Sequence, residues 1–118
     1  MIGQEKTNME GRHMIRVTHL FPGNAGDADL EAYIRNTYLP LLAALPGMLR
    51  FEAAFVTGAP LGIVKVHAFV DQYFDTEDAM NAAMASLAGR ALAREIMANP
   101  RQAPEVFVGK TGIVNRKS

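Results

Sequence analysis

The sequence predicts an α+β fold in which strands and helices follow one another as β-α-β-β-α-β. Three observations lead to this prediction. Four segments alternate apolar and polar residues, two segments repeat apolar residues every three or four positions, and turn-forming Pro and Gly residues separate them. The first pattern is typical of a strand with one buried face, and the second of a helix with one buried side.

The segments that predict strands are residues 14–21, 48–57, 64–74 and 105–114. In the first strand, His19 is predicted to share one face with Phe21, and in the second, Leu49 to share one face with Phe51 and Phe55. A short Gly/Pro-rich loop joins the second strand to the third, which is typical of a β-hairpin.

The first predicted helix covers residues 29–45, where the apolar residues form one stripe. Asp27 or Asp29 can accept hydrogen bonds from its first turn, and a Pro-Gly pair ends it. Pro40 lies inside this helix and removes one backbone donor. We therefore expect a kink or a restart near Tyr38.

The second predicted helix begins at the run Asp75-Thr76-Glu77-Asp78, which supplies a cap and first-turn acids. Gly89 is expected to break or bend it. The helix then resumes over residues 91–97 and stops at Asn99-Pro100.

This element order is that of the ferredoxin-like fold, a four-stranded antiparallel sheet with both helices on one face. The other sheet face is predicted to carry apolar residues as well as charges, and the apolar ones are Leu20, Val56, Phe69 and Tyr73. Such a face is too apolar to remain wet, so we expect a homodimer through it. The charged residues of this face, with which we group His67 and Asp71, are expected to pair with one another or across the interface.

Composition excludes several function classes. The 118 residues suffice for one domain, and 12 basic residues balance 12 acidic ones, so no charge excess favours nucleic acid or a membrane surface. Cysteine is absent, which excludes disulfides and a thiolate nucleophile. Residues 1–13 lack a signal-peptide pattern and are interpreted as an N-terminal tail, residues 14–118 as a single domain, and the expected location is cytoplasmic.

Several motifs resemble the EthD family, which belongs to the dimeric α/β-barrel group. They are the opening strand MIRVTHLFPG, the helical signature Tyr33…Asn36-Thr37-Tyr38-Leu39-Pro40-Leu41, Tyr73-Phe74-Asp75, Ser86 with Gly89, and Pro104-Glu105. The resemblance implies a ferredoxin-like fold that closes a barrel as a homodimer. It also implies a role with a small hydrophobic or aromatic compound, of the kind associated with ether-degradation gene clusters and often labelled a reductase or oxidoreductase. Relatives in the wider group act without metals.

One departure from the family pattern concerns Tyr38, which stands where the family carries histidine. A phenol donates a hydrogen bond well but is a poor base at neutral pH. We interpret Tyr38 as a hydrogen-bond donor and His19 as a possible base, both facing a cleft beneath the first helix. The residues predicted to bind substrate are Tyr33, Thr37, Phe21, Phe51 and Phe55.

Each candidate also has a purely structural interpretation. Tyr38 can bridge core and water, and His19 can be a hydrogen-bonded core histidine. The sequence contains no cofactor fingerprint and no metal cluster, because His67 and Asp71 lie roughly 13 Å apart along an extended strand. Two function classes stay open: a cofactor-independent enzyme acting on a small hydrophobic compound, and a non-catalytic binding or accessory protein for a partner oxygenase.

Overall fold

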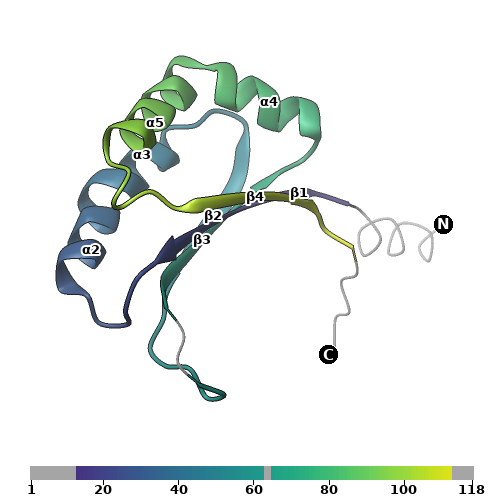
Figure 1. Cartoon of the computed structure of the whole chain (residues 1–118). Coiled ribbons are helices and arrows are strands. Elements are labelled where there is room, and N and C mark those ends of the chain that lie inside the picture. The colour runs from purple at the N-terminus through teal and green to yellow at the C-terminus, as the bar shows by residue number, and fades with distance from the viewer. Residues whose placement is uncertain (1–12, 63–64, 113–118) are drawn as a thin grey trace.

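A computed structural model describes residues 13–62 and 65–112. The predicted tail lies outside these residues except for His13, as does the end of the last predicted strand. The sheet contains β1 (Ile15–Pro22), β2 (Met48–Phe55), β3 (Val66–Phe74) and β4 (Glu105–Lys110) in the order β2-β3-β1-β4. Every neighbouring pair is antiparallel, and the helices cover one face (Figure 1). The predicted ferredoxin-like α+β fold is therefore confirmed.

The first helix is interrupted where Pro40 predicted it. It consists of α2 (Ala28–Tyr33), a π-helical turn η1 (Ile34–Tyr38) and α3 (Leu39–Ala43). Proline has no N–H and its ring clashes with the carbonyl four residues earlier, so the regular register cannot pass through this point. In the π turn, the N–H of Leu39 donates to the carbonyl of Ile34, five residues back. The carboxylate of Asp27 caps the start by accepting from the N–H of Leu30 at 3.1 Å.

The second helix is broken, but not at Gly89 as predicted. It divides into α4 (Glu77–Ala85) and α5 (Leu87–Ala98), and Ser86 between them has an extended backbone. The Ser86 hydroxyl accepts from the N–H of Gly89 at 3.1 Å and donates to the carbonyl of Ala83 at 2.5 Å. A side chain at position 89 would place its Cβ 2.3 Å from the carbonyl oxygen of Met84. Glycine is thus needed for the close approach of the two helices, while serine makes the break.

Two β-bulges change which strand residues face inward, compared with the prediction. Met48 and Arg50 pair with consecutive residues of β3, so Leu49 is an extra residue and is 53% exposed rather than inward. Phe21 pairs with Ala68 and Pro22 with Val66, which leaves His67 as the extra residue of β3. A bulge of this kind redirects a side chain. His67 is consequently buried and does not share the open sheet face with Asp71.

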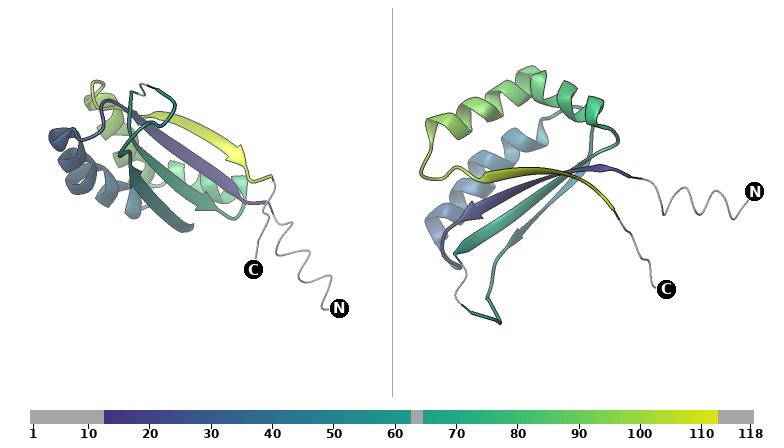
Figure 2. Two further views of the ribbon diagram at one scale, coloured as in Figure 1. Left: turned by 90° about the horizontal axis from the view of Figure 1, so that it is seen from below. Right: turned by 45° about the vertical axis from the view of Figure 1, so that its right-hand side comes forward.

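The core lies between the helices and the inward sheet face. Its largest fully buried apolar side chains are Tyr38, Phe21, Phe74, Ile34 and Leu42. The opposite face of the sheet is uncovered in this single chain (Figure 2). There Arg16 pairs with Asp71 at 3.8 Å, and Arg50 lies 4.3 Å above the ring of Tyr73. Arg16 and Asp71, two charged residues of this face, therefore pair with one another within the chain. No helix among the described residues is long and apolar enough to cross a membrane.

Candidate functional site

Three polar side chains form a continuous hydrogen-bond chain inside the core. Nδ1 of His19 lies 2.7 Å from the hydroxyl of Tyr38, and Nε2 of His19 lies 2.6 Å from Oε1 of Gln72. Nε2 of Gln72 donates to the sulfur of Met48 at 3.4 Å. The amide oxygen of Gln72 can only accept a hydrogen bond, so the neutral His19 ring carries its proton on Nε2. Nδ1 of His19 is then an acceptor, and Tyr38 donates to it.

The alternation of the strands and the turn of the first helix place these side chains on surfaces that face each other. His19 on β1 lies directly opposite Val70 of β3, and Gln72 lies two residues further along the same face. Tyr38 ends the π turn above them, and His19, Tyr38 and Gln72 are at most 2% exposed. The predicted meeting of Tyr38 with His19 therefore takes place, but inside the packed core rather than in an open cleft.

Burial keeps both members of the Tyr38–His19 pair neutral. Desolvation lowers the pKa of His19 below its ordinary value of 6.5, although the hydrogen bond with Gln72 and the charge of Asp71 act in the opposite direction. Desolvation also raises the pKa of Tyr38 well above its ordinary value of 10. At neutral pH the pair is therefore a phenol that donates to an uncharged imidazole.

Aromatic rings enclose the pair on one side. The ring of Phe21 meets that of Tyr38 edge-on, with centroids 4.8 Å apart, and His19 meets Tyr38 in the same manner at 5.6 Å. Phe51 is half-buried against the same core. Of the three phenylalanines predicted to line the site, Phe21 is thus in ring contact with Tyr38.

The other residues that were predicted to bind substrate do not gather around the Tyr38–His19 pair. The hydroxyl of Tyr33 donates to Glu95 of α5 at 2.7 Å. Thr37 lies half-buried on the π turn. Phe55 lies at the sheet margin, where the guanidinium of Arg35 stacks on its ring at 4.4 Å.

Sequence reasoning missed Gln72, although a signal was present. Position 72 falls on the inward face of β3 between Val70 and Phe74, so it is a polar residue at an apolar position. A buried amide needs partners, and the only titratable side chain on the facing strand positions is His19.

A cleft of about 370 Å³ opens beside Phe55. The loop between β1 and α2, Glu31 of α2, the end of β2 and His67 line it. Of the residues described, no group of three or more His, Asp or Glu lies close enough to hold a metal ion.

Comparison with known proteins supports the fold alone. No family model and no curated protein matches the chain. An EthD family protein from Bacillus halodurans superposes with a TM-score of 0.71 at 20% identity, covering 81% of this chain and 96% of that one. EthD proteins are thus among those that share this fold, as the motifs implied.

Two further solved structures show the range of proteins with this fold. A dimeric ferredoxin-like protein of unknown function from Thermobifida fusca superposes with a TM-score of 0.60 at 19% identity, covering 86% of this chain and 92% of that one. SnoaB from Streptomyces nogalater, a cofactor-independent oxygenase, gives 0.54 at 16% identity, covering 91% and 96% respectively.

Proposed function

We propose that this protein acts on a small hydrophobic or aromatic compound without a cofactor, using Tyr38 and His19 as its polar pair. The observation that carries the proposal is the 2.7 Å hydrogen bond from the Tyr38 hydroxyl to Nδ1 of His19, which continues to Gln72. A phenol and an imidazole in contact within an apolar enclosure form a unit that can orient an oxygen and move a proton. The name of SnoaB, a cofactor-independent oxygenase of the same fold, supports a catalytic role.

The pair can take a proton from a ligand by relay. A ligand hydroxyl or acidic C–H gives its proton to the Tyr38 oxygen while the Tyr38 proton passes to Nδ1 of His19. The products of this step are a ligand anion and an imidazolium whose Nε2–H still donates to Gln72. Tyr38 therefore does not have to act as a base itself. A phenol at the position where the family carries histidine is compatible with this step, although a phenol is a poor base.

Access to the pair requires local movement, since Tyr38 is fully buried. The π turn that holds Tyr38 is a natural place for it, because π turns are rare and occur frequently at functional sites. In this proposal, the ligand displaces the ring of Phe21 and takes its place against the Tyr38 hydroxyl.

A second candidate function is non-catalytic binding or support of a partner oxygenase. It is favoured by the fact that both ring nitrogens of His19 are already paired. A base whose nitrogens are both occupied has no free position for a substrate proton unless the relay operates.

The test compares Tyr38→Phe with Tyr73→Phe, a matched loss of one phenolic hydroxyl on the opposite face of the sheet. Each variant is titrated with a panel of small phenols, lactones and ethers, and both binding and product formation are measured. We expect Tyr38→Phe to lose turnover at least roughly a hundredfold, the lower end of what a positioned acid–base group contributes, while Tyr73→Phe retains it. Binding without product in every protein would favour the second candidate, and equal responses of the two variants would refute a role for Tyr38.

We also propose that the protein works as a homodimer through the open sheet face. Phe69 and Phe107 are 37% and 53% exposed there, and a protein of the same fold is named as dimeric. Phe69→Asp should shift the mass measured by light scattering from two chains to one. Leu87→Asp is the matched control, because Leu87 is 80% exposed on the helical side. A wild type that is monomeric at micromolar concentration would refute the dimer.

A further inference from the structure

The cleft beside Phe55 is lined in part by a buried histidine. His67 lines this cleft and is only 1% exposed. Its Nε2 has no hydrogen-bond partner among the described residues. Buried polar atoms are nearly always paired, so an unpaired one calls for an explanation.

The His67 ring is held firmly in place by its surroundings. Its Nδ1 lies 2.9 Å from the carbonyl oxygen of Asn24, which can only accept, so Nδ1 carries a proton. The ring of Phe55 meets it edge-on, with centroids 5.7 Å apart. Gly23 lies against it, and its positive φ of 147° favours glycine at that position. In the neutral ring, Nε2 is therefore a fixed, pre-oriented acceptor.

The other residues that line the cleft, together with its volume, indicate which kind of molecule fits. Phe55, Val56 and Ala25 supply apolar wall, and the volume of about 370 Å³ suits a compact ligand. Glu31 adds an acceptor, and its carboxylate is already paired with Arg35 at 2.9 Å. No Lys or Arg is among the described residues that line the cleft. Arg35 lies beside it, 4.4 Å from the Phe55 ring, but its charge is already paired with Glu31, so no free counter-charge is available there for an anionic ligand.

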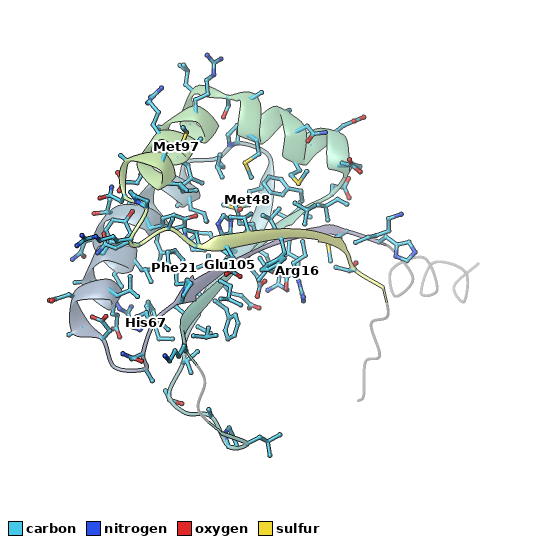
Figure 3. All side chains as sticks on the ribbon, viewed as in Figure 1. Arg16, Phe21, Met48, His67, Met97 and Glu105 are labelled. Atoms are coloured by element: carbon cyan, nitrogen blue, oxygen red, sulfur yellow. The ribbon has the colours of Figure 1, made fainter. Side chains whose placement is uncertain are left out.

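We propose that this cleft binds a neutral small molecule that carries a hydroxyl group on a compact apolar body, and that the hydroxyl donates to Nε2 of His67. The site is distinct from the buried pair, because neither His19 nor Tyr38 is among the residues that line the cleft. The proposal therefore stands or falls independently of the function assigned to Tyr38. Figure 3 shows His67 beneath α2, on the side of the molecule away from the chain ends.

The test uses phenol and anisole, which have the same ring and differ in the hydroxyl proton. Each is titrated at neutral pH into the full-length ¹⁵N-labelled chain, and amide shifts are followed by NMR. We expect phenol to shift the amides of Ala25, Gly26 and Thr57. It should bind roughly three- to tenfold more tightly than anisole, the effect of one net hydrogen bond.

Two variants of His67 separate its two nitrogens. His67→Asn keeps a donor near the position of Nδ1 and removes the Nε2 acceptor, so the preference for phenol should disappear. His67→Gln places an amide near the position of Nε2 and should retain part of the preference. His13→Asn is the matched control and should bind as wild type.

A third variant tests the cleft without touching the histidine. Ala25 is exposed on the cleft wall, so Ala25→Leu fills space without disturbing the core and should weaken phenol and anisole alike. The amide spectrum of each variant reports whether its fold is retained. Equal affinity of wild type for phenol and anisole, shifts clustered elsewhere, or an unchanged preference in His67→Asn would each overturn the proposal.

Discussion

The chain buries two histidines on the neighbouring strands β1 and β3, and they differ in how their nitrogens are satisfied. His19 has both nitrogens paired, with Tyr38 and Gln72. His67, which lines a cleft, has one nitrogen paired with the Asn24 carbonyl and one without a partner among the described residues. Both are at most 2% exposed, so burial alone does not distinguish them.

The difference in hydrogen-bond partners indicates what each histidine can do. A ring with two partners is fixed in one tautomer, and its chemistry must pass through those partners, here Tyr38. A ring with one free nitrogen keeps an acceptor for a molecule that is not part of the chain. The first arrangement therefore stabilises the fold and can relay a proton, whereas the second is suited to recognising a ligand.

The largest expected effect is on stability, in His19→Leu. This change leaves the Tyr38 hydroxyl and Gln72 Oε1 unpaired inside the core, and each unsatisfied buried group costs about 1–3 kcal/mol. The free energy of unfolding, measured by urea denaturation, should fall by about 2–5 kcal/mol. A loss below about 1 kcal/mol would mean that the network contributes little and that the contrast with His67 is wrong.

Tyr38→Phe should have a smaller effect on the same measurement. The ring and its edge contact with Phe21 remain, and only Nδ1 of His19 loses its partner. The expected loss is about 1–3 kcal/mol. Tyr33→Phe is the control, because Tyr33 donates to the half-buried Glu95 near the surface, and its loss should be smaller. The reverse order would contradict the placement of the network in the core.

The pH dependence of stability gives a further test of the role of His19 in the comparison with His67. The folded pKa of His19 lies below the unfolded value of 6.5, so the unfolded chain binds more protons between the two values. The stability that His19 contributes is therefore fully present above pH 6.5 and is lost as the pH falls below it. Melting curves of wild type should show this decline, and His19→Gln should lack it. An identical decline in both proteins would assign the effect to other groups.

The smallest expected effect on stability is that of His67→Asn. The unpaired Nε2 contributes no hydrogen bond to the fold, and asparagine keeps a donor for the Asn24 carbonyl. The free energy of unfolding should change by less than about 1 kcal/mol. A loss as large as that of His19→Leu would show that His67 is a structural histidine and would remove the contrast.

The sequence by itself determined the element order, the sheet with helices on one face, and the interruption of the first helix before Pro40. These follow from local physics, since the apolar period selects helix or strand and proline lacks the N–H that the helix needs. Alternation along β1 also placed His19 on the helix-facing side, and so beneath Tyr38. Gln72 was within reach of the same reasoning, because it occupies an inward position of β3.

Only the tertiary structure decided the positions of Leu49, His67 and the break at Ser86. A bulge shifts the strand register by one residue and so reverses which side chains face inward, yet it depends on pairing with a distant strand. For this reason the alternation of β3 predicted His67 on the open sheet face, whereas the bulge opposite Phe21 and Pro22 places it beside the cleft. The helix break lies at Ser86, which caps α5, and the close approach of α4 and α5 that follows leaves no room for a side chain at position 89.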